Sequence, residues 1–309
     1  MDVKERSASA ASLEVRIPIS PRSDYFNRVW LIARSIREFY PGAIVRVTIG
    51  SDSPESCAQD IPSWSEELGV QWVHVAPNEF EEWRGTAHPY IATMMERFRP
   101  PFLGEYVLML DADIMPIRPF DELFRPDDSM LSMMAHASPF RRHVDEWRDL
   151  YEVYGLPEPR FECEHSGWGA MFQDPSRRFS PPYFNTGVVF GRSDMYENLY
   201  EPYMAALRFV RSRMDSYFFE QIALTLALEK IGLPFDLLPL RYNFPNQSAF
   251  DEAHRGELQN VSLLHFLRTQ IVDREKNFET IADIRRLTER TDLLGSNEIL
   301  RRRIEQLLK

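Results

Sequence analysis

Residues 106–113 read Tyr-Val-Leu-Met-Leu-Asp-Ala-Asp, and this stretch decides the fold. Its five apolar residues predict a strand buried on both faces, which is typical of the centre of a parallel sheet. Asp111 and Asp113 stand two apart in the extended chain, so their side chains point to the same side. Converging carboxylates repel unless a cation lies between them, and Mg²⁺ and Mn²⁺ prefer such oxygens. The pair predicts a divalent metal site, with two solvated turn aspartates as the alternative.

Strands and helices alternate on the N-terminal side of this stretch. Apolar residues at every second position predict a strand over 13–19 with one buried face, followed by a helix that starts near Ser23 and ends before Pro41. This alternation is typical of βαβ units and a mainly parallel sheet, in which ligands bind at the carboxyl ends of the strands. The other elements predicted here are strands over 43–49 and 70–75 and helices over 64–68 and 90–98.

The C-terminal side is less regular. A loop-rich stretch over 136–182 carries many aromatic residues and could form an acceptor-binding lid or an irregular subdomain. The tail, 281–309, should form amphipathic helices with a break at Gly295-Ser296, and it could pack on the domain, pair with a second subunit or contact a membrane. Between them the sequence predicts strands over 186–190, 235–238 and 261–265 and helices over 195–214 and 216–231.

The composition excludes some classes of protein. The 309 residues include 47 acidic and 36 basic ones, and the net charge of −11 argues against nucleic-acid binding through a general cationic surface. Cys57 and Cys163 are interpreted as free thiols in a reducing compartment. No apolar stretch reaches about 18 residues, and the N-terminus lacks the apolar core of a secretory signal. The sequence therefore predicts a cytoplasmic protein, which could still work at a membrane surface.

The whole segment from Glu105 to Phe124 resembles the Asp-x-Asp segment of GT-A glycosyltransferases, particularly those of family 8. Four more segments resemble motifs of that family and occur in its order. They are 183–190 (Phe-Asn-x-Gly strand), 219–221 (Asp-Gln), 238–243 (Leu-Pro…Tyr-Asn) and 263–266 (the strand that bears the third metal ligand). The resemblance implies an α/β, Rossmann-like GT-A fold with a mixed, mainly parallel sheet flanked by helices.

The resemblance also implies a site. Asp111, Asp113 and His265 would bind Mn²⁺ or Mg²⁺, and Gln221 and Glu220 would lie near the reacting face of the donor sugar. The sequence departs from the family at Glu220, where the family has Asp, and after His265, where Arg268 stands in for a family lysine that meets the diphosphate. The residues expected to bind the nucleotide sugar are Ile17, Ser20, Tyr25, Arg97, Asp111, Ala112, Asp113, Asn185, Thr186, Gly187, Gln221, His265 and Arg268.

The implied function is metal-dependent transfer of a hexose from a nucleoside-diphosphate sugar, with UDP favoured, to a glycan or small-molecule acceptor with retention. Residues 1–12 would be a disordered lead-in before one catalytic domain, 13–280, and the tail, 281–309. Within the domain, 13–115 would bind the nucleotide and 116–280 the sugar and acceptor. An inverting enzyme would instead need a carboxylate base, for which the sequence offers Asp145, Glu164, Asp174 and Asp194.

Three other functions stay open. A haloacid-dehalogenase-like phosphatase also places Asp-x-Asp after an apolar strand, but it usually has Thr or Val where this chain has Met115. A nucleotidyltransferase would usually carry a glycine-rich loop after the first strand, and residues 17–21 contain no glycine. A non-catalytic sugar-binding or scaffold protein on the same fold would explain the missing lysine. A homodimer is compatible with each of them.

Overall fold

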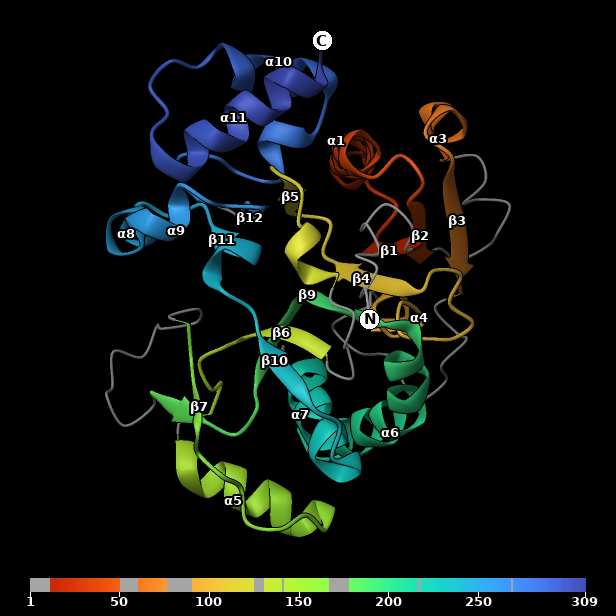
Figure 1. The fold of residues 1–309 in the computed structure, drawn as a ribbon, viewed down its shortest axis with the longest axis vertical. Helices are drawn as coiled ribbons and strands as arrows, with labels where there is room; N and C mark the ends of the chain where they lie inside the picture. Colours follow the sequence, from red (N-terminus) through yellow and green to blue (C-terminus); the bar gives the residue numbers. More distant parts are fainter. Residues whose placement is uncertain are drawn as a thin grey trace, which may run out of the picture.

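The structure is a computed structural model of the chain (Figure 1), and it describes residues 12–50, 61–76, 91–124, 131–140, 142–166, 178–214, 216, 218–267 and 269–309. The predicted lead-in, apart from Ser12, lies outside these residues, as do Cys57, Asp174 and Arg268. The main strands are β1 (Leu13–Ile19), β2 (Ile44–Gly50), β3 (Val70–Val75), β4 (Tyr106–Leu110), β6 (Leu131–Ala135), β9 (Phe184–Arg192) and β10 (Phe235–Leu237).

These strands form one seven-stranded sheet in the order β10-β6-β9-β4-β1-β2-β3. In the described residues every neighbouring pair is parallel except those of β9, which runs antiparallel to β4 and to β6. All five residues of β4 are buried, so the apolar run is the central strand that the sequence predicts. The mixed, mainly parallel α/β sheet is confirmed. Strands from both halves of the chain share it.

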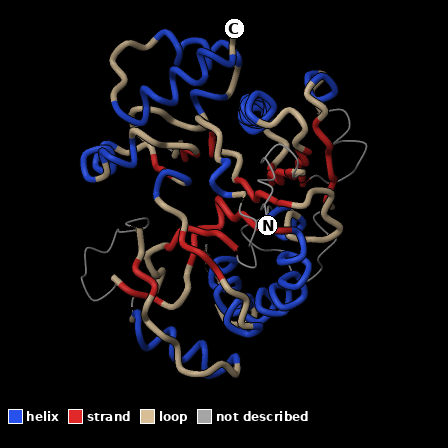
Figure 2. The backbone as a smooth tube through the Cα atoms, viewed as in Figure 1, coloured by secondary structure: helices blue, strands red, loops and turns tan. Residues whose placement is uncertain are grey.

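Helices cover both faces of the sheet (Figures 1 and 2). On one side, α1 packs with the C-terminal helices over one hydrophobic cluster. On the other side, α6 and α7 make the most extensive helix pair and pack with α4 and α5 over a second cluster. The helices are α1 (Ser23–Phe39), α3 (Trp64–Glu67), α4 (Ile91–Glu96), α5 (His143–Tyr154), α6 (Ser193–Arg211), α7 (Phe219–Ile231), α8 (Ser248–Ala253), α9 (Arg255–Leu258), α10 (Ile281–Glu289) and α11 (Gly295–Leu307).

A small second sheet carries part of the site. Its order is β11-β12-β5, with β11 over Phe244–Pro245, β12 over Leu263–His265 and β5 over Ile114–Pro116. In the antiparallel pair β12–β5, His265 lies opposite Ile114, the residue after Asp113. This pairing brings two segments about 150 positions apart in the sequence to the same place. A further hairpin joins β7 (Cys163–Glu164) to β8 (Phe179–Ser180), and short 3₁₀ helices cover Asp121–Leu123, Leu240–Tyr242 and Lys276–Phe278.

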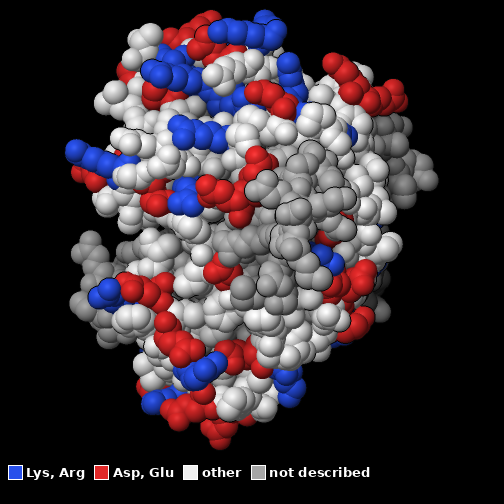
Figure 3. All heavy atoms as spheres, in the orientation of Figure 1, with Lys and Arg blue, Asp and Glu red and all other residues white. Residues whose placement is uncertain are grey.

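The C-terminal helices pack on the domain. Arg303 of α11 is buried and bonds to Glu38 and Ser35 of α1 and to the Pro116 carbonyl, while Arg301 and Arg302 pair with Glu298. The basic triplet is thus balanced within the fold, and basic and acidic side chains alternate over this region in Figure 3. None of the helices in the described residues is long and apolar enough to span a membrane.

One local prediction was wrong. The tail does not break at Gly295-Ser296, because α11 begins at Gly295, whose φ of 57° favours glycine, and residues 290–294 form the link. The loop-rich stretch 136–182 also contains one helix, α5, whose Trp147 and Tyr151 anchor it to the core. Residues 167–177 of that stretch lie outside the described part. Cys163 is a buried free thiol.

Candidate active site

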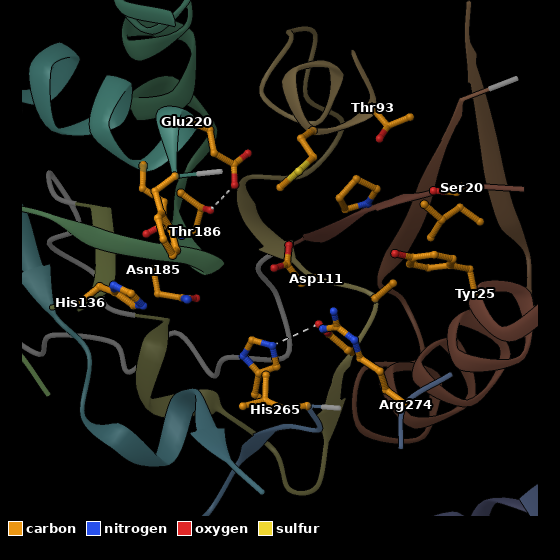
Figure 4. Close-up of a pocket in the computed structure, with 18 of the residues that line it drawn as sticks. Ser20, Tyr25, Thr93, Asp111, His136, Asn185, Thr186, Glu220, His265 and Arg274 are labelled. Carbon is orange, nitrogen blue, oxygen red and sulfur yellow. Dashed lines mark hydrogen bonds and ion pairs between the residues drawn. The ribbon is translucent and has the colours of Figure 1, made fainter. Parts of the chain in front are cut away.

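A cavity of about 360 Å³ opens where β1 and β4 end, the edge at which ligands bind to parallel sheets. Figure 4 shows its labelled side chains converging from several elements around the Asp111 carboxylate. The lining residues are Pro18, Ile19, Ser20, Tyr25, Thr93, Met94, Asp111, Ala112, Asp113, His136, Asn185, Thr186, Phe218, Phe219, Glu220, Gln221, His265, Leu267 and Arg274. Of the predicted residues, ten line this cavity: Ser20, Tyr25, Asp111, Ala112, Asp113, Asn185, Thr186, Glu220, Gln221 and His265.

Asp111 is held by a buried arginine. Arg97, just after α4, donates from Nη1 to Asp111 Oδ1 over 2.8 Å. Its Nε and Nη2 are buried without a hydrogen-bond partner among the described residues. Burial opposes the charge of Arg97, but Asp111 and then Glu220 outweigh it and raise its pKa. Arg97 therefore lies behind the carboxylate instead of lining the cavity, and it sets the orientation of Asp111.

Arg97 is itself anchored by a buried ion pair on β1. Arg16 donates to the backbone carbonyls of Arg97, Arg99 and Pro101 and pairs with Glu14 at 2.7 Å. The other Glu14 oxygen accepts from the Leu103 N–H. These bonds fasten the connection between α4 and β4 to the first strand. The position of Asp111 thus depends on β1 as well as on its own strand.

The carboxylate of Asp113 faces an imidazole ring and a guanidinium group. His265 Nε2 lies 3.3 Å from Asp113 Oδ1, and the Arg274 guanidinium forms an ion pair with Asp113 Oδ2 (Figure 4). The Asp113 carboxylate is buried. Burial opposes its ionisation, but His265 and then Arg274 hold the pKa of Asp113 well below its usual range. Asp113 is therefore an ionised carboxylate at neutral pH.

A chain of amides orients His265. Its Nδ1 lies 2.9 Å from Asn243 Oδ1. Asn243 Nδ2 donates to Asn185 Oδ1 over 2.9 Å. The same oxygen also accepts a hydrogen bond from the Gly187 N–H. Because the Asn243 amide donates on its other side, its oxygen faces the ring, and Nδ1 must carry the proton. Nε2 is then the ring nitrogen that faces Asp113.

Gly187 lies behind this chain and not on the cavity wall. A Cβ at this position would stand 2.8 Å from Asn185 Oδ1 and 3.1 Å from Asp111 Oδ2. Only a residue without a side chain lets β9 approach both groups so closely. The predicted role of Gly187 in ligand binding is therefore indirect, through the space it leaves.

The two predicted catalytic residues, Glu220 and Gln221, lie at the start of α7 and form one wall of the cavity. Thr186 donates to Glu220 Oε1 over 3.1 Å (Figure 4), and burial raises the pKa of Glu220 to about 7 despite the opposing charge of Arg97. Gln221 is buried, and its Oε1 has no hydrogen-bond partner among the described residues. This wall therefore offers an unpaired acceptor and a carboxyl group that titrates near neutrality.

The wall at the end of β1 is built by Ser20 and Tyr25. The Tyr25 ring is supported from behind by Arg28, whose Cζ lies 4.0 Å from the ring centroid, and Arg28 pairs with Asp24 at 2.6 Å. Ile17, which was expected near the nucleobase, is completely buried in the core. Its neighbours Pro18 and Ile19 line the cavity instead.

The residues present fit a divalent cation. Two ligands about 2.1 Å from one ion and roughly at right angles lie about 3 Å apart, close to the 3.3 Å between His265 Nε2 and Asp113 Oδ1. Nε2 and the carboxylate face each other, and either a proton on Nε2 or a cation can bridge them. Asp111 is turned toward Arg97, and no three His, Cys, Asp or Glu side chains of the described residues are gathered around one point. Asp111 would have to rotate to become the third ligand.

The sequence interpretation missed some cavity residues. Arg274 comes from the link before α10, where no pattern distinguishes it from a surface arginine. His136 and Phe218 also line the cavity, with ring centroids 6.0 Å apart, and burial lowers the pKa of His136 to about 4. The aromatic content of 136–182 was the only signal for His136. The proposed bases Asp145, Glu164 and Asp194 are exposed and lie outside the cavity.

Comparison with known proteins agrees with this geometry. The fold resembles the galactosyltransferase LgtC in complex with donor and acceptor sugar analogs (14% identity, 96% of each chain, TM-score 0.54). It also resembles the WbbM bifunctional glycosyltransferase (14% identity, 95% of this chain and 52% of that one, TM-score 0.54). These likenesses confirm the GT-A fold, while no curated protein sequence matches the chain.

The sequence model of the Rhodobacterales glycosyltransferase domain matches residues 21–232. This range covers most of the chain, begins just after β1, and includes the Asp-x-Asp segment, β9 and α7. The predicted enzyme class is therefore confirmed. The chain belongs to the Rhodobacterales glycosyltransferase domain family, and it is a glycosyltransferase.

Proposed function

We propose that this glycosyltransferase moves a hexose from a nucleoside-diphosphate sugar, with UDP as the nucleotide, to a glycan or small-molecule acceptor with retention. The observation that carries the proposal is the order of side chains along one cavity (Figure 4). The ring of Tyr25 lies on one side, Asp111 and His265 lie in the middle, and Glu220 lies on the other side. In a nucleoside-diphosphate sugar the nucleobase, the diphosphate and the sugar follow one another in the matching order.

Each part of the donor would have its own partners. Ser20 and Tyr25 would lie against the ribose and base, with Arg28 keeping the Tyr25 ring in place. Asn185, Thr186 and Gln221 would bond to sugar hydroxyls, because a buried amide oxygen such as Gln221 Oε1 gains most from a donor that arrives with the ligand. Ala112 would contribute only close packing between the two aspartates.

Asp113 and His265, with Asp111 after rotation, would hold Mn²⁺ or Mg²⁺. Such an ion, when bound, acts as a Lewis acid for the negative charge that grows on the leaving diphosphate. His265 favours Mn²⁺, which accepts imidazole beside oxygen ligands more readily than Mg²⁺. The role proposed for Arg97 changes from contact with the donor to support of Asp111. The role of Arg268 stays a prediction.

The acceptor would enter beside His136 and Phe218. Both rings line the cavity, His136 lies next to Asn185 (Figure 4), and burial keeps His136 neutral at pH 7. Aromatic faces beside uncharged amides suit a sugar ring, whose C–H groups pack on the rings while its hydroxyls bond to the amides. Glu220 lies on the same side of the cavity as His136 (Figure 4), near the proposed reacting face.

The test is thermal unfolding with UDP, GDP and other nucleotides, each with and without Mn²⁺. A ligand at 100 times its Kd stabilises the folded protein by about 2.7 kcal/mol, so binding raises the midpoint. We expect a Mn²⁺-dependent increase with UDP that is lost in Asp113→Ala and kept in the exposed control Asp145→Ala. Release of free sugar from UDP-hexose then distinguishes an enzyme from a binding protein. No increase with any nucleotide plus Mn²⁺ would refute the proposal.

A further inference from the structure

Arg274 occupies a position that the proposed function assigns to a metal ion. Its guanidinium pairs with Asp113 Oδ2, while the other oxygen of that carboxylate faces His265. Asp113 is buried, so little water is present to screen a divalent ion from the guanidinium on the same carboxylate. An arginine and a divalent ion would therefore compete for one carboxylate.

The backbone around Arg274 is fixed, but its side chain is not enclosed. Asp273 accepts from the Glu275 N–H over 2.9 Å, and Asn277 accepts from the Asp273 N–H over 2.7 Å. Val272 is fully buried. The Arg274 side chain nevertheless keeps 31% of its surface exposed and reaches into the cavity between His265 and Tyr25 (Figure 4). It can change partners by rotating its own bonds while its backbone stays in place.

The charges along the cavity show why a change of partners is favourable. Asp111 and Asp113 are balanced by Arg97 and Arg274. A divalent ion alone would add two positive charges and leave the displaced Arg274 beside it. A diphosphate alone would add two negative charges close to both aspartates. Added together, the ion and the diphosphate leave the total unchanged, and the displaced guanidinium finds a phosphate that it can bind as a planar fork.

Resting on the proposed function, we propose that Arg274 couples metal and donor binding. It pairs with Asp113 before the donor binds, and it transfers to the diphosphate when the ion takes the carboxylate. The ion and the nucleotide then bind with positive cooperativity. The diphosphate relieves the repulsion between the ion and Arg274, and the ion relieves the repulsion between the diphosphate and the aspartates. Couplings of this kind typically amount to about 5-fold to 150-fold in affinity.

The experiment measures binding of Mn²⁺ to the full-length chain by the electron paramagnetic resonance signal of free Mn²⁺, with and without saturating UDP. In the wild type we expect UDP to tighten Mn²⁺ binding at least about 5-fold. Arg274→Gln should bind Mn²⁺ alone more tightly, by a similar factor, and should lose most of the effect of UDP. Arg274→Lys keeps the charge and should retain part of the coupling. Arg286→Gln, which removes an exposed arginine paired with Asp283 on α10, is the matched control.

Two outcomes separate this inference from the proposed function. If wild-type protein binds neither Mn²⁺ nor UDP, the proposed function fails first. If it binds both, and Arg274→Gln shows wild-type affinity for Mn²⁺ alone and an unchanged effect of UDP, the donor site stands and the role of Arg274 is overturned. A weaker affinity of Arg274→Gln for Mn²⁺ alone would also overturn it, because competition for Asp113 requires the opposite sign.

Discussion

Replacing Glu220 by glutamine should change the way the stability of the protein depends on pH. The pKa of Glu220 is raised from the ordinary 4.5 to about 7, chiefly by burial. Between these two values the folded protein holds a proton that the unfolded chain has released. The free energy of unfolding of the wild type therefore falls as the pH rises through this window.

Glutamine removes this titration but keeps the local structure. Its Oε1 can still accept the hydrogen bond from Thr186. The difference in unfolding free energy between Glu220→Gln and the wild type should be nearly constant below about pH 4.5, and it should grow in favour of the variant up to pH 7. A pKa raised from 4.5 to about 7 corresponds to at most about 3 kcal/mol, and residual contact of this half-buried group with solvent lowers the figure.

The assay is urea denaturation in chelator from about pH 4.5 to about pH 8, with the exposed Glu197→Gln on α6 as the control. His136 titrates in the same window, and its lowered pKa makes stability rise with pH between about 4 and 6.5. Because both proteins contain His136, its contribution cancels in the difference. A difference that does not change with pH would show that Glu220 is not held protonated in the folded protein, and the reasoning would be wrong.

Three further substitutions test the supports of the site. Arg16→Met should cost about 3–5 kcal/mol in urea denaturation, because Glu14 stays buried without its partner; adding Glu14→Gln should recover part of it. Gly187→Ala should cost about 1–3 kcal/mol, because the new Cβ would stand 2.8 Å from an amide oxygen. Asn243→Ala should weaken Mn²⁺ binding about 10-fold to 100-fold without a comparable loss of stability, because the amide orients His265.

The controls for these substitutions come from the same chain. Gly256→Ala introduces a Cβ into open space in α9 and should not destabilise the protein. Asn260→Ala removes an exposed amide outside the cavity and should leave Mn²⁺ binding unchanged. Equal effects of Gly187→Ala and Gly256→Ala would contradict the close approach of β9 to Asp111. A wild-type affinity for Mn²⁺ in Asn243→Ala would contradict the orienting role of the amide.

The elements that could be predicted are those with a strong local pattern. The apolar run before Asp111 indicates a central strand because five consecutive buried side chains suit few other positions, and α1 has an apolar stripe. The alternation in β1 predicts a strand but not its burial, because Glu14 and Arg16 lie in the core as well. By contrast, β6 was missed although it lies between β9 and β10. Its sequence, Leu-Ser-Met-Met-Ala, contains flexible side chains that fit a helix as well as a strand.

For the site, the sequence by itself predicted the ligand chemistry and determined the candidate residues. Two aspartates after a buried strand, together with the order of five family-like segments, led to Asp113, His265 and Gln221, and these side chains do line one cavity. Local spacing can show that two carboxylates share a side, because that depends only on the geometry of one strand.

Only the tertiary structure decided which groups face those side chains. It turns Asp111 toward Arg97, places Arg274 on Asp113, and buries Ile17 in the core. The partners of Asp113 lie more than 150 positions away along the chain, and they meet it through the pairing of β12 with β5. The charge of a buried carboxylate depends on distances of a few ångströms, and such distances are fixed by packing between segments that no local pattern relates.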